Sequence, residues 1–565
     1  MNWRYTAVLA GFLFLFLCVT GRLFYWQTVR ASELTSLGES QYGYRLQLNP
    51  IRGEIKTSDE FSIAANKIAY RVFANPKEVG NVDKTSTLLA DSLKVDKASI
   101  SALLNLDKFW VVLAPQIEDA KKEEIEKMNI PGVGFEQQTI RFYPEASIGA
   151  KLLGFVGKNS EGDNTGYFGL EGYYDRQLKG KSGIAIQVHD AFGRPILAKM
   201  NDMSDAVDGR SLTLHVDRSI QFFMETELKK GIESYGAVSG MAAAIDPKTG
   251  GILAMAAFPT FDPRNYKDYS DDEYRNPFIT DTYEPGSTFK PLVMSAAIDK
   301  GLVKPDSPCP ICAQPIEIGG YKIRTWNNEY TPNESMTDVI VHSDNVGMVY
   351  SSQLLGLPTM LSYFDKFGIW QSTGIDLQGE LASPMRERDS WYPIDVATAS
   401  FGQGISVTPI SLLTAFTAIA NEGKRMEPHV VKSIETPEGD VITIPPKVLE
   451  QPIKAQTARV MAEMMVQAVD RGEAKWTKLP GYRIAGKTGT AQIPIAGHYD
   501  PTQTIASFVG FGPAEDPKFL MLVIIDRPKT SIYGAETAAP VFFKIADKIM
   551  KYYGIPPTEA VREKK

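Results

Sequence analysis

Residues 284–291 read Glu-Pro-Gly-Ser-Thr-Phe-Lys-Pro, and the fold assignment depends on the helix that this segment opens. Apolar side chains recur at helical spacing as far as Ala297, and Gly301 closes the pattern, which predicts a helix buried along one face. Ser287 and Lys290 share a face of its first turn, where free backbone N–H groups also point. A lysine can deprotonate a serine only when burial or nearby positive charge lowers its pKa. The same spacing also fits an ordinary helix start on the surface.

The tripeptide 343–345 reads Ser-Asp-Asn and lies in a predicted turn. A capping box that begins at Ser335 opens a short helix before the turn, and a second helix is predicted over 346–355. A hydroxyl and a carboxamide on such a turn can pass a proton and bind a peptide amide, although ordinary turns contain the same residues. His342 precedes the turn. Because nothing in the sequence pairs it with a carboxylate, we interpret it as a helix-end residue.

Residues 484–491 read Ile-Ala-Gly-Lys-Thr-Gly-Thr-Ala and predict a strand with small residues at its centre. Lys487 offers a cation, and the hydroxyls of Thr488 and Thr490 can bind a carboxylate. Gly489 would let a ligand lie close against the strand. The alternative interpretation is an edge strand whose lysine is solvated.

Two pairs of apolar strands frame these motifs. Residues 240–245 and 252–257 are joined by Asp-Pro-Lys-Thr-Gly-Gly, which favours a hairpin. Residues 507–511 and 519–525 form the second predicted pair. Helical patterns such as 409–421 lie between the two pairs. We therefore predict one sheet, built from both ends of this domain and packed against helices.

The N-terminal part is a predicted membrane anchor. Residues 5–26 are almost wholly apolar, and about 22 helical residues span roughly 33 Å, enough to cross a bilayer once. A cleaved signal peptide is the alternative, but no small-x-small cleavage site comes after the run. Arg4 lies on one side of the run, and Arg22 and Arg30 lie on the other. These charges leave the orientation open.

Composition limits the remaining functions. The 565 residues contain 60 Lys and Arg against 67 Asp and Glu, a net charge of −7, so a nucleic-acid groove is not expected. The five histidines are scattered, and we predict neither a metal nor a cofactor. Cys309 and Cys312 form a local disulfide, remain free thiols, or make half of a zinc site. The zinc site is least favoured because the sequence has no second pair of ligands after them.

The order of the three motifs points to a family. S-x-x-K, S-D-N and K-T-G, headed by Ser287, Ser343 and Lys487, occur together in penicillin-binding proteins and class A β-lactamases. The chain resembles a class B penicillin-binding protein, most closely the cell-division type, over nearly its whole length. It departs from the family pattern over 56–61, where Asp-Arg-x-Gly is usual. Further landmarks of the family are Arg22-Leu23, Arg52-Gly53-Glu54-Ile55, Gly169-Leu170-Glu171, Tyr174-Asp175, Leu178-Lys179-Gly180 and Gly402-Gln403-Gly404.

The resemblance implies an α+β architecture. Its parts are a single N-terminal transmembrane helix, an elongated non-catalytic pedestal of the dimerisation type, and a transpeptidase domain with a serine β-lactamase-like antiparallel sheet flanked by helices. The module before the catalytic region contains no evident nucleophile beside a base, which agrees with this division. The expected boundaries are a cytoplasmic tail at 1–4, the transmembrane helix at 5–26, the pedestal at 30–210, the transpeptidase domain at 211–555 and a C-terminal tail at 556–565.

The resemblance also implies a reaction and a role for each motif. The family performs D,D-transpeptidation on the D-Ala-D-Ala end of peptidoglycan stem peptides through an acyl-enzyme, and β-lactams acylate the same serine. The catalytic set implied here is Ser287 as nucleophile, Lys290 as base, and Ser343 with Lys487 as the route for a proton to the leaving D-alanine. The substrate-binding set implied here is Asn345, Thr488, Gly489 and Thr490.

Location and partners are implied by the same resemblance. The family implies a single-pass protein of the cytoplasmic membrane with its catalytic domain outside, beside a polytopic glycosyltransferase. A β-lactamase or penicillin sensor shares the three motifs, and Glu380 is a candidate base for deacylation in that case. A catalytically idle scaffold is the other alternative. Septal and lateral wall synthesis, and the acceptor amine, are not distinguished by the sequence.

Overall fold

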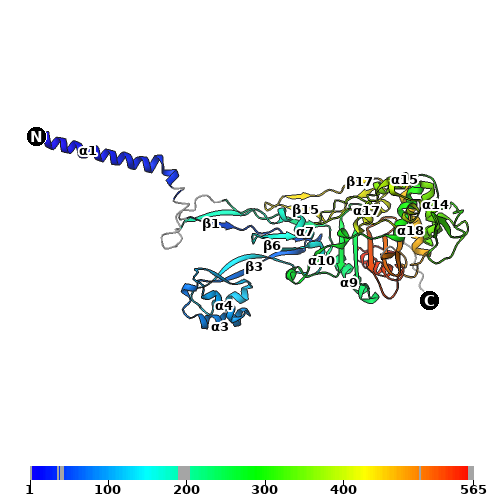
Figure 1. Cartoon of the computed structure of the whole chain (residues 1–565), viewed down its shortest axis with the longest axis horizontal. Coiled ribbons are helices and arrows are strands. Elements are labelled where there is room, and N and C mark those ends of the chain that lie inside the picture. The colour runs from blue at the N-terminus through cyan, green and yellow to red at the C-terminus, as the bar shows by residue number, and fades with distance from the viewer. Residues whose placement is uncertain (1–2, 35–36, 38–42, 189–203, 496–497, 558–565) are drawn as a thin grey trace. The chain divides into compact units, whose positions relative to one another are not determined.

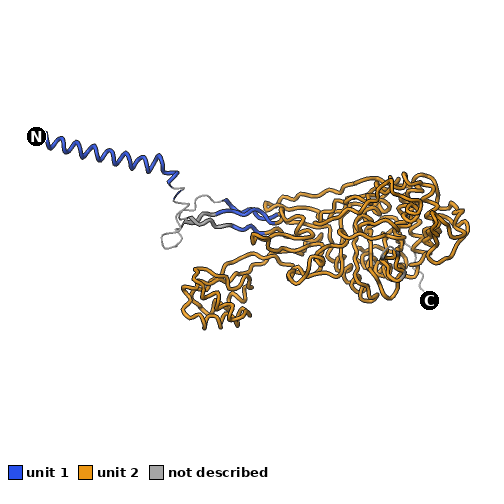
Figure 2. The backbone as a smooth tube through the Cα atoms, viewed as in Figure 1, with its two compact units in different colours: residues 1–51, 179–209 blue, residues 52–178, 210–565 orange. Residues whose placement is uncertain are grey.

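The computed structural model describes residues 3–34, 37, 43–188, 204–495 and 498–557 (Figure 1). Residues 1–2 and 558–565 of the two predicted tails lie outside the described residues. Residues 3–4 belong to the first helix. The chain divides into two compact units (Figure 2). Unit 1 consists of residues 1–51 and 179–209, and unit 2 consists of residues 52–178 and 210–565.

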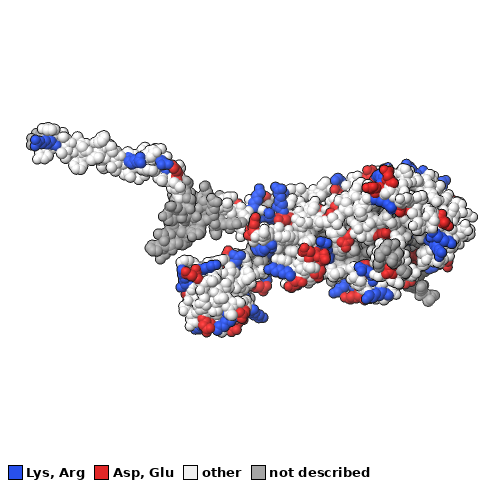
Figure 3. All heavy atoms as spheres, in the orientation of Figure 1, with Lys and Arg blue, Asp and Glu red and all other residues white. Residues whose placement is uncertain are grey.

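Unit 1 carries the apolar helix. Helix α1 (Trp3–Phe24) continues into a π-helical turn, η1 (Tyr25–Val29). Together they give 27 residues that contain an 18-residue window with a mean hydropathy of 2.1, long and apolar enough to cross a membrane. On the face that Figure 3 shows, the shaft of α1 is white and basic side chains lie toward its two ends. In the same unit, β1 (Gly43–Leu48) pairs antiparallel with β8 (Gly183–Val188).

Unit 2 begins with a seven-stranded sheet that contains strands from both predicted domains. Its order is β16-β15-β9-β2-β3-β4, and β5 pairs with β3. Strand β9 lies parallel to β2 and antiparallel to β15, so the sheet crosses the boundary expected at 210/211. The strands are β2 (Ile55–Lys56), β3 (Ser62–Ala74), β4 (Val111–Ile117), β5 (Val133–Phe142), β9 (Ser211–Leu214), β15 (Val431–Glu435) and β16 (Val441–Thr443).

The segment 56–61, where the sequence departs from the family pattern, still forms a tight turn. Thr57 N donates to Phe61 O at 2.9 Å, and Glu60 takes a positive φ of 64°. The turn joins β2 to β3 in an antiparallel pair. Helices α3 (Val82–Leu93), α4 (Lys97–Leu104) and α5 (Asp119–Glu126) pack with β3 and β4 in a core of their own.

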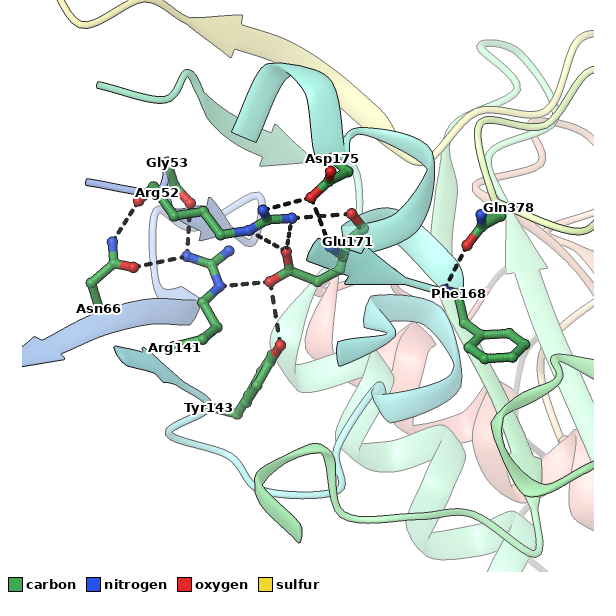
Figure 4. Close-up of polar contacts among 10 residues, drawn as sticks. Arg52, Gly53, Asn66, Arg141, Tyr143, Phe168, Glu171, Asp175 and Gln378 are labelled. Carbon is green, nitrogen blue, oxygen red and sulfur yellow. Dashed lines mark hydrogen bonds and ion pairs between the residues drawn. The ribbon is translucent and has the colours of Figure 1, made fainter. Parts of the chain in front are cut away.

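A buried ion cluster joins three landmarks of this region (Figure 4). The Glu171 side chain is fully buried, and its two oxygens accept from Arg52 Nε at 2.7 Å and Arg141 Nε at 2.6 Å. Arg52 also reaches Asp175 at 2.7 Å. Burial alone would raise the pKa of Glu171, but Arg141 and Arg52 bring it below its ordinary value. The carboxylate therefore stays charged between the two guanidinium groups.

The same landmarks hold a segment of the C-terminal region. The hydroxyl of Tyr174 donates to Asp376 Oδ2 at 2.9 Å. Phe168 N donates to Gln378 Oε1 at 2.6 Å (Figure 4). Asp376 in turn accepts from the backbone N–H groups of Val430 and Val431 at 2.6 and 2.9 Å. One buried carboxylate therefore binds the pedestal tyrosine and the start of β15.

The C-terminal region is built on a five-stranded antiparallel sheet of order β11-β10-β20-β19-β18. This confirms the predicted sheet formed from both ends of the domain. Successive residues alternate between two cores, as period-two strands require: Ala243 and Leu522 face one, Ala242 and Val523 the other. The strands are β10 (Ser239–Ile245), β11 (Ile252–Phe258), β18 (Ala485–Ile495), β19 (His498–Gly512) and β20 (Phe519–Asp526).

Helices cover both faces of this sheet. Helices α9 (Arg218–Tyr235) and α19 (Ala538–Tyr552) contribute to one core. The other core contains α12 (Lys290–Asp299), α14 (Asn345–Leu355), α17 (Pro409–Ala420) and α18 (Ala455–Arg471). The remaining named elements include α6 (Ala150–Leu153), α7 (Gly169–Tyr173), α8 (Asp175–Leu178), α10 (Asp271–Tyr274), α11 (Pro277–Thr280), α13 (Met336–Val341), α15 (Leu357–Phe367), α16 (Pro393–Ala399), β6 (Phe155–Lys158), β7 (Asn164–Tyr167), β12 (Ile316–Ile318), β13 (Tyr321–Ile323), β14 (Arg425–Met426) and β17 (Val448–Glu450).

Candidate active site

Ser287 lies on a 3-10 turn, η4 (Gly286–Phe289), that leads directly into α12. The predicted helix is therefore present, with a tighter first turn. The expectation that it is buried along one face is wrong, because residues 290–297 are buried on every side of the helix. Ser287 is partly exposed, whereas Lys290 is completely buried. Gly286 has a φ of 54° and donates its N–H to Gly402 O at 3.0 Å. A Cβ on Gly402 would lie 2.1 Å from Gly286 O, so the Gly-Gln-Gly landmark supports the serine turn by direct backbone contact.

The Ser-Asp-Asn turn holds Ser343 in an unusual conformation. Its φ is 58°, in the left-handed region that residues other than glycine rarely occupy. Asp344 fixes the turn by capping α14: its Oδ1 accepts from Val346 N at 2.5 Å and Gly347 N at 3.2 Å. Asn345 is fixed as well, because its Nδ2 donates to Arg324 O at 2.9 Å.

Lys290 is directed into this turn. Its Nζ donates to Ser343 O at 2.6 Å and Asn345 Oδ1 at 2.8 Å, and it lies 3.1 Å from Ser343 Oγ. Burial and the charge of Lys487 lower the pKa of Lys290 well below its ordinary value, although Asp344 opposes the shift. A lysine in this setting loses its proton more readily than a solvated lysine and can act as a base.

Lys487 reaches the same turn from β18, at the edge of the sheet. Its Nζ lies 3.0 Å from Ser343 Oγ and 3.2 Å from Thr488 Oγ1. The side chain is 3% exposed, and burial lowers its pKa. The alternative interpretation is therefore correct about the edge strand and wrong about the lysine, which is buried rather than solvated.

Gly489 brings β18 against the serine turn. A Cβ at this position would lie 2.4 Å from Ser507 Oγ and 2.7 Å from Thr288 Cγ2. The glycine therefore allows close packing of protein on protein, which the sequence interpretation did not include. Next to it, Thr490 Oγ1 accepts from Gly534 N at 3.0 Å. The eight predicted site residues thus lie in three neighbouring places: the turn η4 with the start of α12, the turn before α14 with the first residue of that helix, and strand β18.

His342 ends helix α13 as predicted, but the expectation that it has no carboxylate partner is wrong. Its Nδ1 lies 3.0 Å from Glu334 Oε2. Glu334 is buried, and burial together with Asp344 raises its pKa to about 9. Glu473 was also missed, and its carboxylate accepts from Thr488 Oγ1 at 3.2 Å. Both glutamates come from irregular segments outside the three motifs, so no local pattern in the sequence indicates them.

The two cysteines of the C-x-x-C segment are bonded to each other. The ligand atoms of Cys312, Glu334 and Asp344 lie within 4.8 Å of one another. Because the Cys312 sulfur is in a disulfide, it is not available as a thiolate ligand. The expectation that the protein uses no metal stays a prediction.

An antiparallel sheet between helical layers, with S-x-x-K, S-D-N and K-T-G side chains brought together at its edge strand, defines the active-site-serine enzymes that recognise penicillin. Family models agree with that class. The penicillin binding protein transpeptidase domain matches residues 240–551, and the penicillin-binding protein dimerisation domain matches residues 47–214. The chain belongs to the class B penicillin-binding proteins.

Individual relatives cover nearly the whole chain. Stage V sporulation protein D of Bacillus subtilis is 34% identical over 100% of this chain and 88% of its own length. Peptidoglycan D,D-transpeptidase FtsI of Escherichia coli is 30% identical over 99% of this chain and 93% of its own length. Among solved structures, penicillin binding protein 2X of Streptococcus thermophilus has a TM-score of 0.75 at 26% identity, covering 91% of this chain and 81% of that one. Penicillin binding protein 3 of Mycobacterium tuberculosis, complexed with aztreonam, has a TM-score of 0.71 at 26% identity, covering 91% of this chain and 99% of that one.

Proposed function

We propose that the protein is a peptidoglycan D,D-transpeptidase that cross-links stem peptides through an acyl-enzyme on Ser287 and is acylated there by β-lactams. The observation that carries the proposal is the Ser343 hydroxyl, which lies 3.1 Å from Lys290 Nζ and 3.0 Å from Lys487 Nζ. This arrangement connects the proposed base, three residues after Ser287 in the chain, through one hydroxyl to a second lysine. The relatives named as D,D-transpeptidases support the same reaction.

The first half-reaction transfers the acyl group to the enzyme. Lys290, as the neutral amine, takes the proton of the Ser287 hydroxyl, and the oxygen attacks the carbonyl carbon between the two D-alanines. The C–N bond then breaks. The proton passes through Ser343, with Lys487 beside it, to the nitrogen of the departing D-alanine. In the second half-reaction an amine attacks the ester, an amide forms, and Ser287 recovers its proton.

The remaining residues bind the donor peptide. Asn345 lies at the start of α14 and would hold its amide, while Thr488 and Thr490 would bind its terminal carboxylate along β18. The backbone N–H groups of Ser287 and Thr490 would form the oxyanion hole. Each such donor contributes about 3 to 4 kcal/mol to transition-state stabilisation.

A labelled penicillin tests the assignment. It should modify the full-length protein in detergent covalently, and Ser287→Ala should abolish the label. Ser362→Ala is the matched control, because Ser362 is an exposed serine on α15. Labelling of Ser287→Ala equal to that of the unmodified protein would refute the nucleophile. Thermal melting of each variant separates loss of the nucleophile from loss of the fold.

A β-lactamase is the alternative with the same motifs, and Glu380 was its candidate base. The Glu380 carboxylate accepts from Thr373 N and Oγ1, both at 2.6 Å, and from Gly374 N at 3.1 Å. The Glu380 carboxylate is therefore hydrogen-bonded within its own loop, and none of these contacts involves Ser287. Rapid, repeated turnover of nitrocefin would nevertheless favour a lactamase over the transpeptidase. The scaffold alternative predicts that Ser287→Ala supports normal growth.

The membrane arrangement is part of the proposal. We place the short N-terminal tail in the cytoplasm and the catalytic domain outside the cytoplasmic membrane, beside a polytopic glycosyltransferase. The boundaries 5–26, 30–210 and 211–555 remain proposals. An impermeant maleimide should label Glu438→Cys, on the exposed β15–β16 turn, in intact cells. Labelling only after permeabilisation would overturn the orientation, and absence of a glycosyltransferase from mild-detergent preparations would argue against the partner.

A further inference from the structure

A polar cavity of about 250 Å³ adjoins the candidate active site. Its walls come from the segment after β13, from the Ser-Asp-Asn turn and from the end of α18. Two of its lining residues also contact the catalytic groups: Asp344 follows Ser343 directly, and Glu473 accepts a hydrogen bond from Thr488. A ligand in this cavity would therefore lie beside the machinery assigned to acyl transfer.

The lining of this acidic cavity carries an excess of carboxyl groups. Glu329, Glu334, Asp344 and Glu473 contribute four, whereas Arg471 contributes the single guanidinium. That guanidinium is already paired, because Arg471 Nη2 lies 2.5 Å from Asp338 Oδ1. The ring of His342 is occupied by Glu334. The field inside the cavity therefore favours a cation.

One buried oxygen in the wall has no hydrogen-bond partner among the residues that the structure describes. It is Thr325 Oγ1, and its residue is 6% exposed. Buried polar atoms in native proteins nearly always have partners, so this hydroxyl can accept from a ligand with an N–H donor. Glu334 also lines the cavity, but burial and a hydrogen bond with Asp344 raise its pKa to about 9, so it keeps a proton toward Asp344.

The size of the cavity and the side chains at its rim limit which kind of cation it can bind. A volume of about 250 Å³ is several times the roughly 30 Å³ that one water occupies, so the cavity can take an organic cation. Trp326 lines the rim, is 48% exposed, and donates its Nε1 to His342 O at 3.1 Å. Tyr533 packs edge-on against it, with ring centroids 5.7 Å apart. An indole held in this way suits an aliphatic chain or an ammonium group.

We propose that the acidic cavity binds the primary ammonium group of the acyl acceptor, an aliphatic amine on a neighbouring stem peptide, and delivers it to the acyl-enzyme. This rests on the proposed transpeptidase function, which requires an amine as its second substrate. In this arrangement the donor peptide lies along β18, and the acceptor amine reaches the ester from the side of the Ser343 turn. Thr325 accepts a hydrogen bond from the ammonium, and Glu329 attracts it at the rim. The ammonium then passes one proton to the neutral amine of Lys290, its nitrogen attacks the ester carbon, and a second proton returns to the Ser287 oxygen as the ester C–O bond breaks.

The test uses the full-length protein in detergent with a thiolester donor and n-pentylamine as the acceptor probe. Mass spectrometry measures how the acyl group divides between water and the amine. The amide product should saturate with n-pentylamine, and Thr325→Val should raise the half-saturating concentration about tenfold, because a hydrogen bond to a charged group is lost. Thr139→Val, on an exposed position of β5, is the matched control and should change nothing.

A second variant protects the test against misfolding. Glu329→Gln alters an exposed side chain and should raise the half-saturating amine concentration about threefold, while the neutral acceptor n-pentanol shows no change. Labelled penicillin is measured on every variant. If labelling of Ser287 is normal and amine saturation is unchanged in both variants, the cavity is not the acceptor site. If Ser287→Ala still takes the label, the proposed function itself has failed.

Discussion

The side-chain nitrogens of Lys290 and Lys487 both lie within hydrogen-bonding distance of the Ser343 hydroxyl oxygen, at 3.1 and 3.0 Å. One lysine comes from the helix that begins at the nucleophile and the other from the edge strand of the sheet. Two buried ammonium groups this close repel each other, so the loss of one proton is favoured. The low pKa of Lys290 therefore depends on its partner as well as on burial.

The first prediction is that Lys487→Gln moves the pH dependence of acylation. Removing the charge raises the pKa of Lys290, so a higher pH is needed to form its neutral amine. The acidic limb of the acylation rate should therefore shift toward alkaline pH, and the maximum rate should fall about a hundredfold or more. Stopped-flow acylation by a chromogenic β-lactam measures this. Lys475→Gln, at an exposed position near the end of α18, is the control. An unshifted acidic limb would contradict the coupling.

The second prediction concerns Glu334, which faces Asp344, Asp338, Lys290 and His342. Its pKa is raised to about 9 in the folded protein, so the folded state holds a proton that the unfolded state has released. Stability should therefore fall as pH rises from about 4.5 to about 9 and level off above that. Glu334→Gln imitates the protonated form, so its melting temperature should fall less over this range. Equal slopes for both proteins would show that Glu334 is ionised.

The third prediction tests the pedestal ion cluster. Glu171→Gln removes the carboxylate that pairs with buried Arg141 and leaves Arg52 with Asp175 as its counter-charge, which should destabilise the protein by about 3 to 5 kcal/mol. Glu161→Gln removes an exposed carboxylate from the β6–β7 turn and serves as the control. Denaturant titration followed by intrinsic fluorescence measures the difference. A change below about 1 kcal/mol would mean that the cluster is solvated.

The fourth prediction concerns the contact between β18 and the serine turn. Gly489→Ala would place a methyl group 2.4 Å from Ser507 Oγ, so β18 must move away from Thr288. Acylation should fall at least tenfold, with a stability loss of about 1 to 3 kcal/mol. Adding Ser507→Gly removes the nearest clashing atom and should restore part of the acylation rate. If the double variant is no better than Gly489→Ala, the effect arises from the strand conformation instead.

The sequence predicted the sheet and the three motifs because each has a local signal. The helix after Ser287 has a 3.6-residue apolar pattern, and the strand at 484–491 has small residues that a sheet edge accommodates. The hairpin between residues 245 and 252 has a recognisable turn. These elements occur where predicted, with ends that differ by a few residues.

The missed features depend on contacts between distant segments. Glu334 lies before helix α13 and contacts His342 at the end of that helix. Glu473 lies beyond the end of α18 and accepts a hydrogen bond from Thr488. No spacing rule relates such pairs. The burial of Lys487 was also missed, because an edge strand is solvated only where nothing packs over it, and here the Ser343 turn covers the lysine. The positive φ of Ser343 has no signature in a Ser-Asp-Asn tripeptide.

Strand β9 bonds to β2 on one side and to β15 on the other, and this has a consequence for dissecting the protein. A fragment that began at residue 211 would leave the N–H and C=O groups of β9 unpaired along one side. Such an open edge invites pairing with a second copy and aggregation. We therefore expect a fragment that begins at residue 211 to aggregate more readily than one that retains the segment from Arg52 onward.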